Sequence, residues 1–141
     1  FAFPLHPREP RRHASHKAPG AKEDVMEAID TRTMRGIRVY LEHGGFEILE
    51  EGWAHGDDIA DFIARDEGDL VFVSCQVTQN DGEGFPEENA DRAALERLAM
   101  AYLAEHLDFE DVLVRFDVMR LLVVGEGRAL LRHRLNALGT L

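Results

Sequence analysis

The sequence predicts an α/β fold in which a central mixed sheet is flanked by helices, in the order α-β-β-β-α-β-β. Two observations lead to this class. Apolar side chains recur every three or four residues in 23–43 and 87–107, which is the period of an amphipathic helix. The segments between and after them are apolar runs bounded by glycine-containing turns, which are typical of strands. With 141 residues and 45% hydrophobic positions, the chain is long enough for one domain and too short for two.

We expect residues 1–22 to form a flexible basic arm and residues 23–141 to form the single domain. The arm is rich in Pro, His and Arg, a composition that cannot bury enough apolar surface to offset the cost of ordering the backbone. Its three histidines fit a disordered polar segment better than a metal site. They are His6, His13 and His16.

The first helix is predicted over 23–43, where it ends at the glycine pair 44–45. A first strand follows at 46–49, where the sequence reads FEIL. The apolar positions of the helix are Val25, Met26, Ile29, Met34, Ile37, Tyr40 and Leu41.

A hairpin forms the predicted centre of the sheet, with strands at 59–64 and 70–77 joined by an acidic turn at 66–69. Alternation places Ile59, Asp61 and Ile63 on one face of the first strand. On the second strand, Leu70, Phe72, Ser74 and Gln76 share one face, and Val71, Val73, Cys75 and Val77 share the other. Because this second set is wholly apolar, we expect the hairpin to be buried on both sides. Asp61 then stands where an apolar residue would be expected.

The remainder of the chain supplies a loop at 79–86, the helix at 87–107 and two final strands, at 112–124 and 129–133. The glycines in these loops do not open a helix directly after a strand, as a phosphate-binding loop requires. Nucleotide binding therefore has no support from the sequence.

Charge and cysteine content exclude several classes of function. The arm holds five basic residues and one Glu, a net +4, so the total of −11 leaves −15 on residues 23–141. Such an acidic body repels polyanions. A single cysteine excludes an intramolecular disulfide and a multi-cysteine zinc site, and fits a reducing compartment. No stretch approaches the roughly 20 apolar residues of a membrane span, so we expect a cytoplasmic protein with no membrane contact.

Several pieces of the chain, in order, resemble the YraN-like family of small uncharacterised bacterial proteins. The matching pieces are YLEHGGFEILEEGW at 40–53, DFIARDEGDLVFV at 61–73, AYLAEHL at 101–107, VRFDV at 114–118, and His133, Asn136 and Ala137. This resemblance implies a restriction-endonuclease-like fold of the PD-(D/E)XK type. In that nuclease core an Asp, a second acid and a Lys gather around one or two magnesium ions, which polarise the phosphate and activate a water.

Carried over position by position, the family's catalytic Asp is Asp61, and its Glu-Val-Lys run falls on Ser74, Cys75 and Gln76. The family's other two acids fall on Met34 and Ile59. Only Asp61 keeps the catalytic residue type, and one carboxylate is a weak ligand for magnesium. The resemblance therefore implies a catalytically degenerate member, with Asp61, Ser74 and Gln76 at the former catalytic positions.

Two interpretations of Asp61 follow. It is a relic metal ligand, or it is a partly buried carboxylate that bonds to Ser74, Gln76 or a backbone amide, which we favour. A displaced metal site would need a second carboxylate close to Asp61. The residues that could supply such a site are Glu47, His55, Asp57 and Asp58.

Three functions are consistent with these features. We favour a non-catalytic interaction or nucleic-acid-associated module that requires no cofactor. The alternatives are an active magnesium-dependent endonuclease with a relocated acidic site, and an acidic domain that binds a basic protein partner. For DNA, the basic candidates on the last strand are Arg128, Arg132, His133 and Arg134, which we expect to form an ordinary solvated edge. Cys75 is expected to be a small buried hydrophobe and not a nucleophile.

Overall fold

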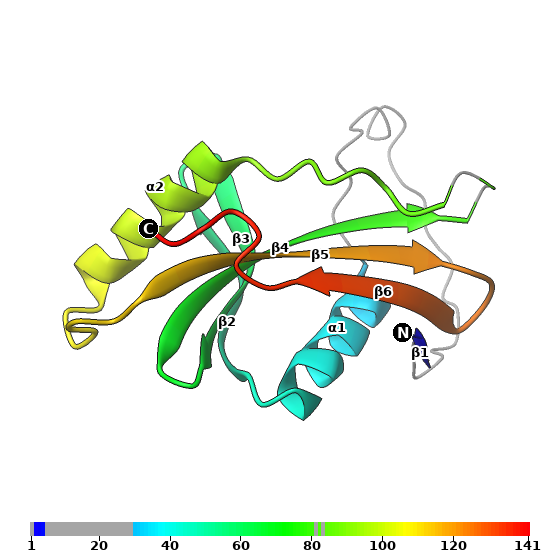
Figure 1. Cartoon of the computed structure of the whole chain (residues 1–141), viewed down its shortest axis with the longest axis horizontal. Coiled ribbons are helices and arrows are strands. Elements are labelled where there is room, and N and C mark those ends of the chain that lie inside the picture. Colours follow the sequence, from blue (N-terminus) through cyan, green and yellow to red (C-terminus); the bar gives the residue numbers. More distant parts are fainter. Residues whose placement is uncertain (1, 5–29, 81, 83) are drawn as a thin grey trace.

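The structure is a computed structural model of the chain that describes residues 2–4, 30–80, 82 and 84–141. Its elements are β1 (Ala2–Pro4), α1 (Thr31–His43), β2 (Glu47–His55), β3 (Asp58–Asp66), β4 (Asp69–Gln79), α2 (Arg92–Glu105), β5 (Val114–Val123) and β6 (Arg128–Arg134). From α1 onward their order confirms the predicted α-β-β-β-α-β-β arrangement (Figure 1).

The strands form one sheet in the order β1-β6-β5-β4-β3-β2. Only β4 and β5 pair in parallel, and the other neighbours are antiparallel, so the sheet is mixed as predicted. β4 and β5 can pair in parallel because α2 serves as the crossover between them, which returns the chain to the end of the sheet where β4 begins. This pairing places Ser74 beside Val118 and Gln76 beside Arg120.

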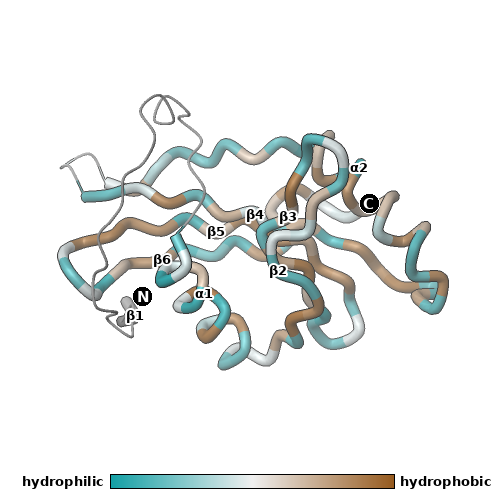
Figure 2. Tube along the Cα trace, turned by 180° about the vertical axis from the view of Figure 1, so that it is seen from behind, coloured by the Kyte–Doolittle hydropathy of each residue, from teal (hydrophilic) through white to brown (hydrophobic). Residues whose placement is uncertain are grey.

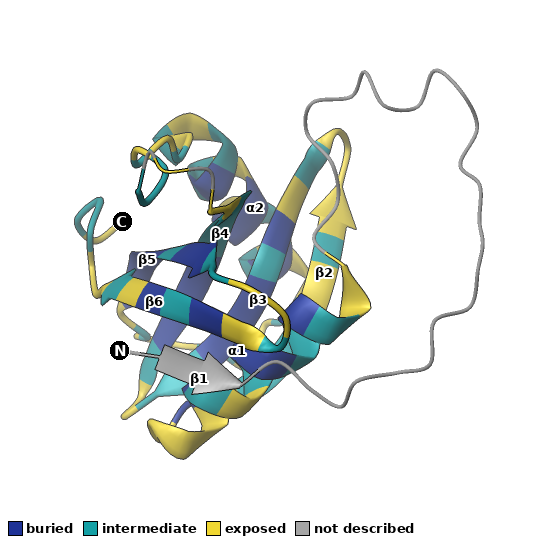
Figure 3. Cartoon of the chain, turned by 90° about the vertical axis from the view of Figure 1, so that its right-hand side faces the viewer, coloured by how far each residue is buried: buried dark blue, intermediate teal, exposed yellow. Residues whose placement is uncertain are grey.

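The two helices cover opposite faces of the sheet (Figure 1), and apolar residues of the hairpin pack on both sides. Val71 and Val73 of β4 pack in the cluster of α1, whereas Leu70 and Phe72 pack in the cluster of α2. The hairpin is therefore buried from both sides, as its composition predicts. Hydrophobic residues follow the central strands (Figure 2), and those strands are largely buried (Figure 3).

The first helix begins later than predicted. α1 starts at Thr31, where the Asp30 side chain accepts a hydrogen bond of 2.8 Å from the Thr33 N–H. This N-cap satisfies one of the free amides of the first turn and ends the helix in that direction. Residues 23–29, where we placed the start, lie outside the described residues.

The second helix is also shorter than predicted. It begins at Arg92 because Asp91 caps it through a hydrogen bond of 3.2 Å from the Ala94 N–H. The preceding residues 87–90 have no helical structure. They form part of an extended segment that crosses the sheet.

At the amino-terminal end, Ala2–Pro4 form β1, which pairs with β6 at the edge of the sheet. We placed these residues in the flexible arm; the other arm residues and their histidines lie outside the described part of the chain. Neither helix described in the structure has the length and apolar character needed to cross a membrane.

Candidate functional site

Asp61 lies where the pairing between β3 and β4 stops. Regular pairs run from Asp66 with Asp69 to Phe62 with Val73. One residue further, the Asp61 carboxylate accepts a hydrogen bond of 2.7 Å from the backbone N–H of Cys75. The side chain thus takes the place of a strand carbonyl. This is the geometry of the structural interpretation, in which a backbone amide satisfies the carboxylate.

The environment of Asp61 disfavours its charged form. Burial raises the pKa of Asp61 to about 6, and the hydrogen bond from the Cys75 N–H opposes this only in part. Burial, and then the charge of Asp61, raise the pKa of the Cys75 thiol well above its ordinary value. Cys75 therefore stays protonated near neutral pH and is a poor nucleophile.

Gln76, which the resemblance aligns with a catalytic Lys, is engaged by the segment before α2. Its Nε2 donates to the Glu87 carbonyl at 2.7 Å, and its Oε1 accepts from the Asn89 N–H at 2.8 Å. Strand alternation puts Gln76 and Ser74 on the side of the sheet that α2 covers. Both ends of the amide hold the segment before α2, so Gln76 is not free to orient a water.

One of the candidate acids upstream of Asp61 is engaged by an arginine. Asp58 is bound by the Arg97 guanidinium through hydrogen bonds of 2.8 and 3.1 Å. Among the described residues, no three His, Cys, Asp or Glu side chains lie together in a way that could hold a metal ion. The residues at the family's catalytic positions therefore do not fit magnesium, because Asp61 is bonded to the backbone, Ser74 is neutral and the Gln76 amide is engaged.

A second polar cluster lies on the side of the sheet that α1 covers. Its centre is Asp117 of β5, which is 0% exposed. The carboxylate accepts hydrogen bonds from Arg115 Nε at 3.0 Å, His133 Nε2 at 2.8 Å and the Asn136 backbone N–H at 2.8 Å. Since an ionised carboxylate only accepts, His133 Nε2 carries the proton of this bond. Nδ1 of the same ring shares a hydrogen bond of 3.3 Å with the Tyr40 hydroxyl.

Arg115 links this cluster to the acidic hairpin turn. Its Nη2 donates to Asp66 at 2.8 Å, and its Nη1 donates to Asp69 at 3.2 Å. Burial alone would lower the pKa of Arg115, but hydrogen bonds to Asp117 and Asp66 raise it above its ordinary value. Burial would likewise raise the pKa of Asp117, but hydrogen bonds from His133, Arg115 and Asn136 bring it below its ordinary value. Both shifts favour the charged forms of Arg115 and Asp117, and each nitrogen of the guanidinium has a carboxylate partner.

The sequence predictions treat His133 as a surface residue and do not group the other members of this network. His133 points to the opposite side from the neighbouring arginines, and its side chain is only 5% exposed. It therefore does not belong to a basic surface. One signal in the sequence could have revealed the network: Arg115 and Asp117 lie two residues apart, and so on one face, within an otherwise apolar strand.

Three arginines of the last two strands, Arg120, Arg132 and Arg134, lie on the other side of the sheet, together with Ser74 and Gln76. Strand pairing aligns Gln76, Arg120 and Arg132 in one row. The next row holds Ser74, Val118 and Arg134. We call Arg120, Arg132 and Arg134 the arginine face. Ser74 and Gln76 of β4 are thus its direct neighbours.

Comparison with known proteins places the chain in a family. A model described as "Uncharacterised protein family UPF0102" matches residues 35–121. A UPF0102 protein of Beutenbergia cavernae is 38% identical over 114 residues, which cover 77% of this chain and 96% of that relative. A UPF0102 protein of a Parafrankia strain is 33% identical over 103 residues, which cover 70% of this chain and 85% of the relative. The resemblance to the YraN-like proteins is thereby confirmed, and the chain belongs to the UPF0102 family.

Proposed function

We propose that this protein is a non-catalytic member of its family that uses a nuclease-like fold as an interaction module. The observation that carries this proposal is the state of Asp61. The one carboxylate at a former catalytic position is bonded to the Cys75 backbone amide, and burial raises its pKa to about 6. The Lys position holds Gln76, whose amide is engaged at both ends.

Metal-dependent hydrolysis makes demands that this arrangement does not meet. Magnesium needs hard, charged oxygen ligands that repay the loss of its tightly held waters. To coordinate the ion, Asp61 would have to give up a 2.7 Å hydrogen bond in a setting where burial disfavours its charged form. The neutral side chains of Ser74 and Gln76 supply neither a second charge nor a cation.

Association with nucleic acid is the interaction that a specific feature favours. Three arginines, Arg120, Arg132 and Arg134, lie beside the former catalytic positions on one face of β5 and β6. Guanidinium groups bind phosphate oxygens in a bidentate way. The acidic remainder of the domain opposes such binding, so we expect modest affinity that falls steeply with salt.

Calorimetric titration of the intact chain with magnesium and with manganese tests the loss of catalysis. We expect no binding heat in the wild type and none in Asp61→Ala. The matched comparison is a variant that restores the family's residues, Ser74→Glu with Gln76→Lys, in which a second acid and the Lys return beside Asp61. We expect this variant to gain metal binding that is lost again when Asp61→Ala is added.

A cleavage assay completes the test. Single-stranded, duplex and branched DNA are incubated with the wild type in magnesium and in manganese, and product formation is followed on denaturing gels. Metal-dependent cleavage by the wild type that Asp61→Ala abolishes would refute the proposal and favour the endonuclease. Metal heat in the wild type that disappears in Asp61→Ala would count against it in the same way.

A further inference from the structure

An extended segment crosses the arginine face before α2 begins. We call residues 85–89 the strap. The Arg132 guanidinium lies over the Phe85 ring, with its Cζ 4.2 Å from the centre of the ring. The Pro86 carbonyl accepts a hydrogen bond of 3.1 Å from Arg120 Nη1. The Glu87 carbonyl accepts from Gln76 Nε2 at 2.7 Å. Three consecutive strap residues therefore contact side chains of β6, β5 and β4 in turn.

The strap also places a carboxylate on the third arginine. Glu88 Oε1 pairs with Arg134 Nη1 at 3.2 Å. Glu88 Oε2 is buried and has no hydrogen-bond partner within the part of the chain that the structure describes. A buried acceptor without a donor is unfavourable. The closed position of the strap therefore leaves one charged group incompletely satisfied.

Side chains alone hold the strap to the sheet. Among the described residues, no backbone–backbone hydrogen bond joins 85–89 to a strand. Its contacts come from Gln76, Arg120, Arg132 and Arg134, and the sheet pairing beneath it is complete without it. The strap can lift without breaking a ladder of the sheet.

We propose that the strap is an internal cover that a strand of nucleic acid displaces from the arginine face. Each strap contact has a counterpart in such a strand. A phosphate can replace the Glu88 carboxylate on Arg134 and the Pro86 carbonyl on Arg120, because guanidinium groups favour phosphate oxygens. A base can replace the Phe85 ring against Arg132, because every base offers a π face to a guanidinium. This inference rests on the proposed function, since it names the surface by which the non-catalytic module binds.

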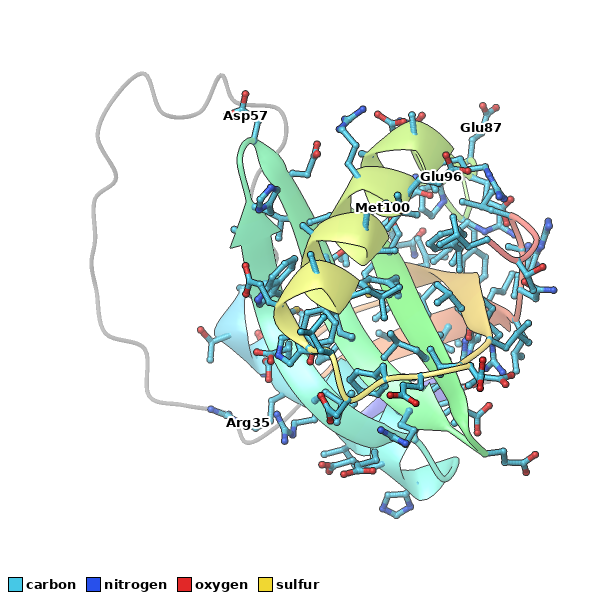
Figure 4. All side chains as sticks on the ribbon, turned by 90° about the vertical axis from the view of Figure 1, so that its left-hand side faces the viewer. Arg35, Asp57, Glu87, Glu96 and Met100 are labelled. Atoms are coloured by element: carbon cyan, nitrogen blue, oxygen red, sulfur yellow. The ribbon has the colours of Figure 1, made fainter. Side chains whose placement is uncertain are left out.

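The test compares two neighbouring charge changes in the full chain. Glu88→Gln removes the carboxylate that pairs with Arg134, whereas Glu87→Gln makes the same change in net charge at a side chain that points away from the fold (Figure 4). Binding of a fluorescein-labelled single-stranded DNA is measured by anisotropy at low salt, in EDTA. Because an exposed ion pair contributes little, we expect Glu88→Gln to bind about twofold to fivefold tighter than Glu87→Gln.

Removing arginines provides the second readout. In the Glu88→Gln background, Arg134→Gln should abolish the gain and lower the slope of log affinity against log salt by about one. Arg38→Gln is the matched control, because Arg38 is a paired surface arginine of α1, which covers the opposite face. Thermal melts verify that each variant is folded.

Three results would overturn the proposal: equal binding by Glu88→Gln and Glu87→Gln, an effect of Arg134→Gln no larger than that of Arg38→Gln, or no binding by Glu88→Gln at low salt. Because binding is measured without metal, these outcomes do not depend on cleavage. Cleavage in magnesium would refute the non-catalytic function and leave the result on the strap unchanged.

Discussion

Two aspartates in one sheet, the fully buried Asp117 and the partly buried Asp61, show opposite behaviour. Burial pushes the pKa of both carboxyls upward. At Asp117, donors from Arg115, His133 and Asn136 reverse the effect and bring the pKa below its ordinary value. At Asp61, the single hydrogen bond from a backbone N–H does not offset the effect of burial, and the pKa is raised to about 6. The number of donors therefore decides in which direction the pKa of each carboxyl moves.

The polar residues around Asp117 and those around Asp61 differ in how many elements of the fold they connect. The network around Asp117 draws on pieces that resemble the family: the helix end with Tyr40, the acidic turn, the VRFDV strand and His133. It ties α1, the hairpin, β5 and β6 together. The positions of the family's catalytic residues carry no comparable network. One set of polar residues therefore holds the elements of the fold together, whereas the polar residues around Asp61 make few contacts between elements.

The largest expected effect is from Asp117→Asn, which removes the charge that Arg115 and His133 share. Removing one partner of a buried ionic network is strongly unfavourable, so we expect a loss of about 3 kcal/mol in the free energy of unfolding. Urea unfolding followed by circular dichroism measures it. The matched control is Asp61→Asn in the same sheet. A loss below about 1 kcal/mol for Asp117→Asn would mean that the network does not hold the fold.

Asp61→Asn is expected to act in the opposite direction. The pKa of Asp61 in the folded state, about 6, lies above that of the unfolded chain, so the folded state binds more protons between these values. The contribution of Asp61 to the stability of the folded state is complete below about pH 4 and is lost as the pH rises through about 6. Above that pH we expect Asp61→Asn, whose amide oxygen can still accept from Cys75 N–H, to be more stable than the wild type by roughly 2 kcal/mol.

Urea unfolding between pH 4 and pH 8 measures this difference. The wild type should lose stability relative to Asp61→Asn as the pH rises, and the two curves should run parallel above the pKa of Asp61. Asp117 contributes in the other sense, since its lowered pKa adds stability that is lost only as the pH falls below its ordinary value. A constant gap across the range would contradict the raised pKa of Asp61.

A smaller effect should come from Tyr40→Phe, at the outer end of the Asp117 network. The change removes the hydroxyl that bonds to His133 Nδ1 at 3.3 Å, and we expect a loss of about 1 kcal/mol. Combined with Asp117→Asn in a double-mutant cycle, the two losses should be non-additive, because both act on the His133 ring. Strict additivity would show that Tyr40 and Asp117 are not coupled through the histidine.

Several features of the fold could be predicted because they depend on local periodicity. The spacing of apolar side chains distinguished helices from strands. The apolar residues on both faces of β4 predicted that this strand is buried from both sides. The helix starts could not be predicted so well, because several acidic residues precede each helix and only one becomes the cap. Asp30 and Asp91 are those caps.

The candidate site could be predicted only in part. The sequence showed that Asp61 lacks its acidic partners, and a backbone amide was among the expected bonds. It could not show that the amide belongs to Cys75, since that depends on where the pairing of β3 with β4 ends. Nor could it show that Gln76 and three arginines hold one segment, because these contacts join four separate parts of the chain.

By itself, the sequence determined the kinds of elements, their order and the burial of the hairpin. These properties follow from side-chain chemistry at short spacings along the chain. Only the tertiary structure decided which polar groups meet. Arg115 reaches Asp66 across 49 positions of sequence because β5 returns parallel to β4 through α2. The register of that crossover is set by core packing on both faces, which no local pattern encodes.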